Sequence, residues 1–340
     1  MRFTFGADQR LFADTTRDLL TSECPPAAVR EAWSSESGRS RERWKKLAAM
    51  GVIGITVPER WGGLGLDELA LVLLLEESGR AALPEPIVET VAVGVPTIVE
   101  SGDEELGDRW LAAVATGDAI VTVGLSSQPY VADAHEADLL LLQHGSDLHA
   151  VAAADVTLTA QPSIDGSRRL STVGWAPSPA TLLASGPPAG DLVAGAFDRG
   201  ALAVAAQLLG VSQHLIDVTA DYARERHQFG KPIGSFQAVK HHLADALLAV
   251  ELARPVVYRA AWSVARHEPT RAVDVSMAKA YASDAGDLAA RVALQVHGAI
   301  GYTWECDAHL WMKRAWALAA SWGDARWHRR RIASVILAAR

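Results

Sequence analysis

Hydrophobic and polar residues follow a helical period in the first and last parts of the chain and a strand period in the middle. Between residues 7 and 117, charged and apolar residues mix at helix spacing, with breaks at Pro and Gly clusters. This pattern predicts an α-helical segment. Short β-rich runs follow at residues 119–125, 138–143, 148–153 and 156–160. Gly, Ser, Asp and Pro separate these runs, which predicts a small antiparallel β-domain.

Long alanine-rich helices are expected from Asp191 onward. Apolar residues recur there every seven positions, at Leu202, Leu209, Ile216 and Ala223. Breaks near residues 230–235, 268–269 and 298–302 divide the region into four helices with short connections, which is typical of an antiparallel bundle. Pro255 lies inside the second of these helices and should kink it or mark its break.

The predicted fold is therefore mainly α with a small β-domain. We expect an N-terminal α-helical domain over residues 1–118, a shortened β-domain over 119–190 and a C-terminal four-helix bundle over 191–340. A chain of 340 residues, 49% of them hydrophobic, is long enough for such a layered globular arrangement.

Composition narrows the class of function. The net charge of −8 argues against nucleic acid as a partner, because that requires a basic face. Cys24 and Cys306 lie far apart and near no ligand set, so we expect neither a disulfide framework nor a metal site. The charged N-terminus predicts no secretory signal, and residues 69–75 are the longest apolar run we identify, so we expect no membrane span. A cytoplasmic protein fits these features.

Candidate chemistry is densest in residues 222–245, YARERHQFGKPIGSFQAVKHHLAD. Arg226 offers a planar fork of donors suited to a phosphate. Gln228 offers a donor and an acceptor, and Phe229 an apolar face for a ribose or adenine. Gly230 and Pro232 then end the helix. An ordinary helix C-terminus, where a late Arg complements the helix dipole, is the alternative interpretation.

This segment resembles the flavin-ADP clamp of the acyl-CoA dehydrogenase family. Residues 51–66, GVIGITVPERWGGLGL, resemble the family's first-domain turn. Residues 295–303, QVHGAIGYT, resemble the stretch that touches the ADP half of the flavin across a subunit boundary, through Gln295 and Gly298, with Ala299 where Gly is usual. The resemblance runs from about residue 8 to about 335. It implies the fold given above, FAD, and α,β-desaturation of an acyl-CoA thioester.

The resemblance fails where the family carries its catalytic base. Counted without gaps, the glutamate of the usual Tyr-Glu-Gly-Thr segment falls on Trp322, whose indole N–H can donate but cannot accept a proton. In other branches the base lies on the first bundle helix, where this chain has Gly200. Asp198 and Asp324 lie close to these positions as substitutes, although a cap or a surface charge is the ordinary interpretation of each.

A second departure concerns the loop that holds the flavin ring in the family. Residues 126–138, SSQPYVADAHEAD, look like the start of that loop joined directly to a later strand, with the intervening hairpin deleted. A complete flavin-ring pocket within this chain is therefore not expected.

These observations lead to one hypothesis and two alternatives. The hypothesis is a non-catalytic subunit, resembling those of the α2β2 actinobacterial acyl-CoA dehydrogenases of sterol side-chain degradation. A catalytic sister subunit would bring the base, the FAD ring pocket and most of the acyl-CoA site, and an electron-transfer flavoprotein or similar acceptor would take the electrons. One alternative is a homomeric enzyme with a relocated acid or base: His135, Asp198, His241 or Asp324. The other is a non-catalytic scaffold. The basic run 326–331, RWHRRR, is explained as a cationic last helical turn or as an anion site.

Overall fold

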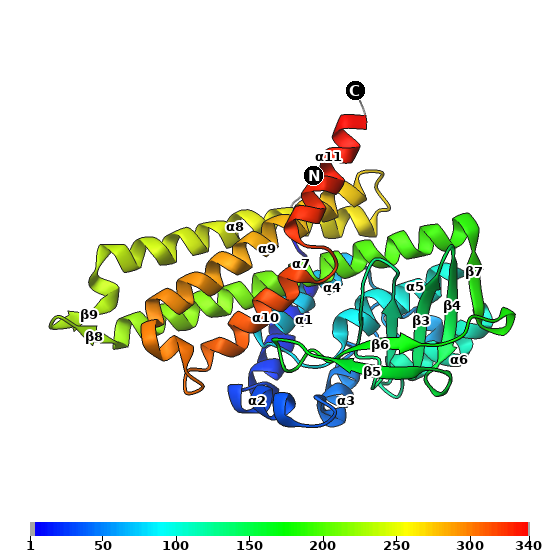
Figure 1. The fold of residues 1–340 in the computed structure, drawn as a ribbon, viewed down its shortest axis with the longest axis horizontal. Coiled ribbons are helices and arrows are strands. Elements are labelled where there is room, and N and C mark those ends of the chain that lie inside the picture. The colour runs from blue at the N-terminus through cyan, green and yellow to red at the C-terminus, as the bar shows by residue number, and fades with distance from the viewer. Residues whose placement is uncertain (1–3, 339–340) are drawn as a thin grey trace. The chain divides into compact units, whose positions relative to one another are not determined.

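The computed structural model describes residues 4–338, which fold mainly as α-helices with two small β-sheets and a short hairpin (Figure 1). The chain forms two compact units. One contains the residues up to Arg30, Val72–Leu83 and the residues from Val204 onward; the other contains Glu31–Leu71 and Pro84–Ala203. The predicted fold class, mainly α with a small β part, is confirmed.

The first part of the chain is helical, as its periodicity predicts. Its α-helices are α1 (Ala7–Glu23), α2 (Pro26–Ser34), α3 (Arg41–Ala49), α4 (Glu68–Arg80), α5 (Val95–Ser101) and α6 (Glu104–Ala115), with a 3-10 helix η1 (Glu59–Trp61) and a π-helix η2 (Val88–Gly94). Side-chain caps fix the N-termini of two of these helices, α3 and α6. Ser40 accepts a hydrogen bond from the Arg43 N–H at 3.2 Å, and Asp103 accepts one from the Leu106 N–H at 2.9 Å.

The middle part forms two sheets. Their strands are β1 (Val121–Gly124), β2 (Val131–Ala132), β3 (Leu139–His144), β4 (Asp147–Ala152), β5 (Thr157–Gln161), β6 (Leu170–Gly174) and β7 (Leu182–Ser185). One sheet has the order β1-β3-β4-β7 and the other β2-β6-β5. All pairs are antiparallel except β1 and β3, which are parallel. The expectation of a wholly antiparallel domain is wrong at this pair, because the segment between the two strands is long enough to return the chain in the same direction.

Helix α7 (Gly186–Glu225) begins before the predicted start at Asp191. Pro187 and Pro188 follow Gly186 directly; the fixed φ of proline suits the first turn of a helix, whereas the sequence analysis assigned these residues to the β-domain. By length and composition α7 is apolar enough to cross a membrane, which the prediction missed, but 89% of its most apolar window is buried, as in a core helix. The division of the chain at residues 118 and 190 stays a prediction.

The last part contains more helices than predicted. After α7 come α8 (Gln237–Ala265), α9 (Arg271–His297), the 3-10 helix η6 (Gly298–Tyr302), α10 (Ala308–Ala320) and α11 (Ala325–Ala338). The sequence pattern missed the break between α10 and α11. We expected Pro255 to kink this helix or to mark its break; α8 runs through Pro255 without interruption, so the break does not occur, and the kink stays a prediction. The four heptad positions of α7 are all buried, as expected.

Candidate functional site

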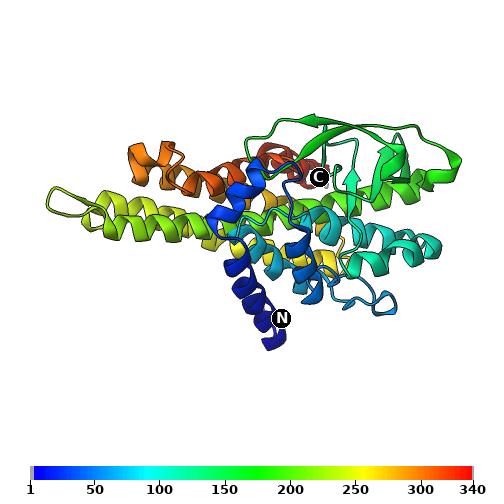
Figure 2. The same ribbon diagram turned by 90° about the horizontal axis from the view of Figure 1, so that it is seen from below.

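The segment after α7 forms a β-hairpin, which the sequence interpretation as a plain turn missed. Strand β8 (His227–Gln228) pairs with β9 (Lys231–Pro232), and a 3-10 helix, η5 (Ile233–Ser235), leads into α8. Phe229 and Gly230 form the turn with φ of 54° and 77°. Two consecutive positive φ angles are typical of the tightest hairpin turns, but a phenylalanine rarely adopts one. The hairpin projects beyond the helices at one end of its unit (Figures 1 and 2).

Arg226 begins this hairpin. Its N–H donates to the Tyr222 carbonyl at 2.8 Å, and its carbonyl accepts from the Ile233 N–H at 2.7 Å, so its backbone is fixed at both ends. Its side chain is exposed and makes no hydrogen bond or ion pair with residues 4–338. A fixed backbone with an available guanidinium suits an external anion.

The other two clamp residues of the hairpin also face solvent. Phe229 is 90% exposed, although its backbone is strained. Gln228 is exposed and donates from Nε2 to the His227 carbonyl at 2.8 Å, which leaves its own carbonyl oxygen available. A strained backbone that presents a large apolar ring to water is the pattern expected of a binding residue rather than a packing residue.

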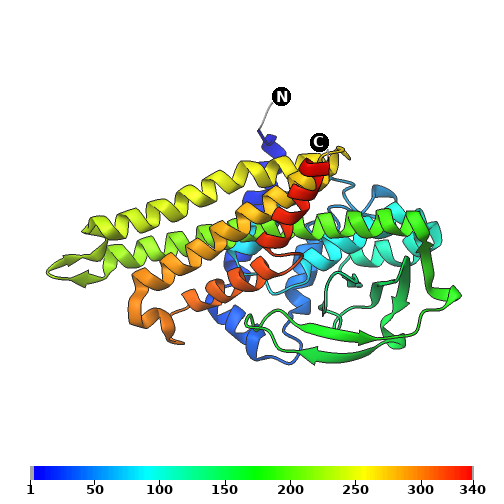
Figure 3. The ribbon, with the colours of Figure 1, turned by 45° about the horizontal axis from the view of Figure 1, so that its top comes forward.

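The end of α9 supplies the remaining predicted residues. Gln295 lies on its last turn, exposed and without a hydrogen bond to the described chain. Gly298 ends the helix with φ 64° and ψ −138°, a conformation that essentially only glycine adopts, and Ala299 follows it on the surface. His297 stacks on Tyr222 of α7 with ring centroids 4.4 Å apart. The structure therefore brings Arg226, Gln228, Phe229, Gln295, Gly298 and Ala299 to one end of the helices (Figure 3).

Trp322 lies in the break between α10 and α11. It is 3% exposed and has φ 52°, followed by Gly323 with φ 82°. His328 donates from Nε2 to the Trp322 carbonyl at 2.8 Å. Lys279, which is fully buried, donates to the Gly323 carbonyl at 3.0 Å and to the Ala319 carbonyl at 3.0 Å. Two buried side chains therefore hold this strained turn in place, and the family's base position within it carries an indole and no carboxylate.

Burial controls the protonation of His328. The loss of solvent lowers the pKa of His328 to about 4, and the charge of Lys279 acts in the same direction. The imidazole is therefore neutral at pH 7. Its Nε2 carries the proton that the Trp322 carbonyl accepts, and its Nδ1, 3.1 Å from the Ser276 hydroxyl, is the acceptor. Sequence analysis missed both Lys279 and His328.

The two substitute carboxylates have different surroundings. Asp324 is exposed and accepts a hydrogen bond from the Trp327 N–H at 2.6 Å, so it caps α11. Asp198 and Gly200 are both buried within α7. Beside them, Arg199 contacts Glu68 at 2.7 Å and Glu100 at 2.8 and 2.5 Å. A buried cation held by two carboxylates is typical of a structural ion cluster.

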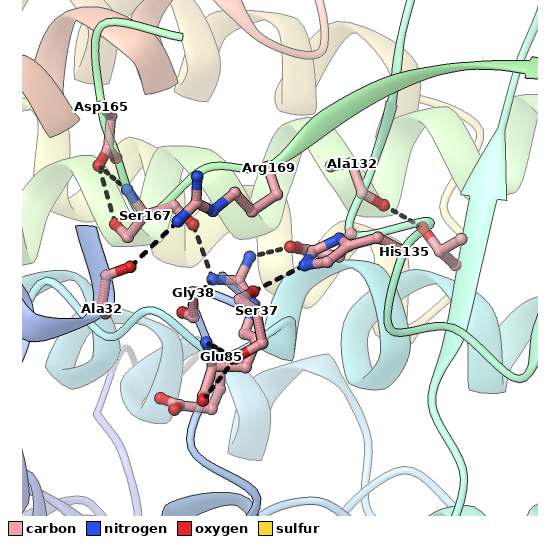
Figure 4. A network of polar contacts seen from close by, with 12 residues as sticks. Ala32, Ser37, Gly38, Glu85, Ala132, His135, Asp165, Ser167 and Arg169 are labelled. Atoms are coloured by element: carbon pink, nitrogen blue, oxygen red, sulfur yellow. Dashed lines mark hydrogen bonds and ion pairs between the residues drawn. The ribbon is translucent and has the colours of Figure 1, made fainter. Parts of the chain in front are cut away.

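The loop of residues 126–138 is held by a polar network in its own unit (Figure 4). Asp133, with φ 58°, forms a buried ion pair with Arg39. The Arg39 guanidinium also donates to the Ser167 carbonyl at 2.7 Å, and His135 donates from Nε2 to the Ser37 carbonyl at 2.7 Å. Arg169 donates to the Ser35 carbonyl at 2.5 Å. The connection between α2 and α3 thus fixes the loop.

A pocket of about 740 Å³ lies against this network in the same unit. His135, Glu136, Glu36, Gln161, Arg169 and Ser171 are among its lining residues. Burial lowers the pKa of His135, so its imidazole is neutral at pH 7 and leaves Nδ1 as an acceptor. This pocket can hold a small polar molecule, and His135, one of the predicted acid or base positions, lines it.

Two other sequence interpretations concern residues of α8 and α11. His241 is exposed on the first turns of α8. The run 326–331 lies in the first half of α11, so the interpretation as a last helical turn is wrong. There, His328 is buried, and Arg329 forms an exposed ion pair with Asp284.

Comparisons with known proteins agree with this architecture. A family model described as the acyl-CoA dehydrogenase N-terminal domain matches residues 6–118, and one described as the C-terminal domain matches residues 190–337. The chain is 33% identical over 328 residues to acyl-CoA dehydrogenase IpdE2 of Mycolicibacterium smegmatis, covering 96% of this chain and 97% of that relative. It is 31% identical to IpdE2 of Mycobacterium tuberculosis, with 91% of each chain covered.

Solved structures give the same assignment. The ChsE4-ChsE5 complex from Mycobacterium tuberculosis has a TM-score of 0.89 and 28% identity, with 99% of each chain covered. A variant of the Tcur3481-Tcur3483 steroid ACAD has a TM-score of 0.89 and 25% identity, also with 99% of each chain covered. Members of the matched family are oxidoreductases that use FAD. The chain therefore belongs to the acyl-CoA dehydrogenase family.

Proposed function

We propose that this chain is the non-catalytic subunit of a heteromeric, FAD-dependent acyl-CoA dehydrogenase, and that it completes the FAD site of a catalytic sister subunit. The observation that carries the proposal is a contrast between two places in one unit. Five of the six predicted cofactor-binding residues are exposed and Gly298 is half-buried, and the side chains of Arg226 and Gln295 have no partners among residues 4–338. The family's base position, in contrast, holds buried Trp322.

The exposed residues fit the ADP half of FAD. Arg226 pairs with the diphosphate through charge-assisted hydrogen bonds. Gln228 and Phe229 contact the ribose and adenine. Gln295 and the backbone of Gly298 and Ala299, at the end of α9, would hold the same part of the cofactor. Ala299 adds a methyl group where the family usually has glycine, so the backbone approach is less close there.

The chemistry belongs to the sister subunit. Bound FAD supplies the hydride acceptor for α,β-desaturation of an acyl-CoA thioester. The reaction also requires a carboxylate within reach of the α-proton. Trp322 cannot accept that proton, Gly200 has no side chain, and Asp324 already caps α11. The loop of residues 126–138, which corresponds to the family's flavin-ring loop, is instead held by Arg39 and Ser37.

The comparisons support the proposed partner and substrate classes. One similar structure is a complex of two proteins, and another is a steroid ACAD. We accordingly assign a steroid side-chain CoA as the substrate class, bound mainly by the sister subunit. Electrons leave through an electron-transfer flavoprotein or a similar acceptor in the cytoplasm. The three-part division at residues 118 and 190 is part of this proposal.

A second candidate function rests on the pocket beside His135. A homomeric enzyme would use the neutral His135 imidazole as a base there, and Arg169 would donate hydrogen bonds to an anionic group of the substrate. This candidate needs flavin-independent acyl-CoA chemistry in the isolated chain, which the first proposal does not.

The test is to purify the chain alone and together with its sister subunit, and to record the visible flavin absorption and the acyl-CoA dehydrogenase activity of both. The proposal predicts a colourless, inactive chain and a yellow, active complex. A yellow and active lone chain would show a homomeric enzyme. Two colourless samples would show a scaffold.

A further inference from the structure

A second, smaller pocket lies between α1, α4, α7 and α10, within the unit that carries the clamp. Its volume is about 340 Å³, at the lower end of the range for small-molecule sites. Leu20, Pro25 and Ala81 contribute apolar surface, and Arg17, Glu77 and Arg80 contribute charge. Neither the clamp nor the Trp322 turn contributes to it, so this pocket is separate from the function proposed above.

One wall of the pocket is a stacked ring pair. The rings of His214 and Trp311 lie 3.9 Å apart between centroids, at an interplanar angle of 16°. The Trp311 indole is fixed, because its N–H donates to the Arg80 carbonyl at 2.8 Å. The pair is therefore held in a fixed position in the pocket wall, where it offers preformed aromatic surface to a ligand.

His214 contributes hydrogen-bonding capacity that the chain itself does not use. Neither ring nitrogen has a hydrogen-bond partner among residues 4–338. Burial first, and the charge of Arg80 second, lower the pKa of His214 to about 4, while Asp217 opposes this. At pH 7 the imidazole is neutral and offers one donor and one acceptor. His214 is half-buried, so its unpaired ring nitrogens are available to a ligand or to water.

Arg80 adds unused donors beside this ring. One of its terminal nitrogens contacts Asp217 at 2.6 Å, and the remaining guanidinium N–H groups have no partner among the described residues. Arg17 is different, because its guanidinium forms a bidentate ion pair with the Glu77 carboxylate, with hydrogen bonds of 2.8 and 2.5 Å. The lining thus has two cations and one anion, and its open donors belong to Arg80.

We propose that this pocket binds a small organic anion, with a carboxylate on a flat apolar body. The carboxylate accepts hydrogen bonds from Arg80, His214 supplies a second polar contact, and the body of the ligand packs on the His214–Trp311 wall and Leu20. A ligand with a carboxylate satisfies the open donors, and an apolar body suits the remaining surface.

The test uses cinnamate as the probe and its neutral amide, cinnamamide, as the matched control, with binding followed by ligand-observed NMR on the full chain in its purified assembly. Saturable cinnamate binding is expected with Kd of about 1 mM or tighter, as for a compact fragment in a preformed pocket. Cinnamamide should bind about tenfold more weakly, because it lacks the charge that Arg80 recognises.

Variants separate the site from surface binding. Arg80→Met and His214→Phe should each lower the affinity for cinnamate by about tenfold. The first removes the guanidinium donors, and the second keeps the ring stack but removes both ring nitrogens. Arg80→Lys keeps the charge and serves if Arg80→Met fails to fold by circular dichroism. Arg291→Met is the control, because Arg291 pairs with Asp287 on α9, outside the pocket. Unchanged affinity in Arg80→Met and His214→Phe, equal binding of acid and amide, or no saturable binding would overturn the proposal. If Arg80→Met does not fold, unchanged affinity in His214→Phe alone overturns it.

Discussion

Replacing Gly210 with alanine should lower the free energy of unfolding, because the backbones of α4 and α7 are in direct contact where the two helices cross at Gly210. A Cβ added at Gly210 would lie 1.8 Å from the Glu76 carbonyl oxygen and 2.6 Å from the Arg80 nitrogen. These are backbone atoms, so the two helices must separate. Overpacking of this kind costs about 1 to 3 kcal/mol. Separation also stretches the 2.6 Å Arg80–Asp217 contact.

Helix propensity acts in the opposite direction. Alanine in a helix is favoured over glycine by about 1 kcal/mol, so the expected net loss for Gly210→Ala is up to about 2 kcal/mol. Gly190→Ala is the matched control. Gly190 lies in the same helix with no heavy atom within 4 Å of an added Cβ, so this variant should gain about 0.5 to 1 kcal/mol.

Urea unfolding followed by circular dichroism measures both variants. The crossing predicts that Gly210→Ala unfolds at lower urea and Gly190→Ala at higher urea than the wild type. If Gly210→Ala is as stable as the wild type, the close approach of α4 and α7 is wrong.

Three further predictions concern acid stability, catalysis and assembly. The pKa values of His214 and His328 lie near 4 in the folded chain, below the ordinary 6.5. The unfolded state therefore takes up more protons, and stability, full above about pH 6.5, should fall as the pH drops towards 4, by up to about 3 kcal/mol for each histidine. Urea midpoints across this range test it, and a flat profile would contradict it. The isolated chain should desaturate no acyl-CoA; turnover that Asp324→Asn or Asp198→Asn abolishes would show a misplaced base. The lone chain should aggregate, and coexpression with the sister subunit should rescue it, because α8 exposes apolar side chains such as Leu248 and Leu252. A monodisperse monomer in light scattering would count against an obligate complex.

Periodicity predicted the helices of the fold because one face of each is buried. The seven-residue repeat of α7 identified four buried positions, and the four predicted β runs each overlap a strand. Strands β6 and β7 escaped notice because they are short and half exposed, with little apolar alternation. The break between α10 and α11 was missed because its turn uses Trp322, a residue that rarely adopts a positive φ.

The clamp residues could be identified from sequence because they lie in two short segments with family-like spacing. The structure adds that these segments meet, through the stack of Tyr222 on His297. The polar network around Asp133 could not be predicted in this way. Its partner Arg39 lies 94 residues away, and no local pattern encodes such a contact. Lys279 was missed because a lysine in a helix is ordinarily exposed, whereas here it bonds two carbonyls in the interior.

The shared FAD site is tested most directly by the flavin content of the assembled complex with Arg226→Ala. Loss of a charge-assisted pair typically costs about 1.5 to 3 kcal/mol, or roughly ten- to a hundred-fold in affinity. Arg226→Lys should restore only part of the binding, because a point charge does not reproduce the planar fork. Arg224→Ala is the control, since Arg224 lies two residues away on the surface and pairs with Asp221.

Bound FAD per complex is measured after gel filtration, with the subunit ratio determined on the same fractions. The account predicts that Arg226→Ala assembles normally but loses flavin, although the base and the ring pocket belong to the sister subunit, and that Arg224→Ala retains it. A normally assembled Arg226→Ala complex with full flavin would contradict the shared site.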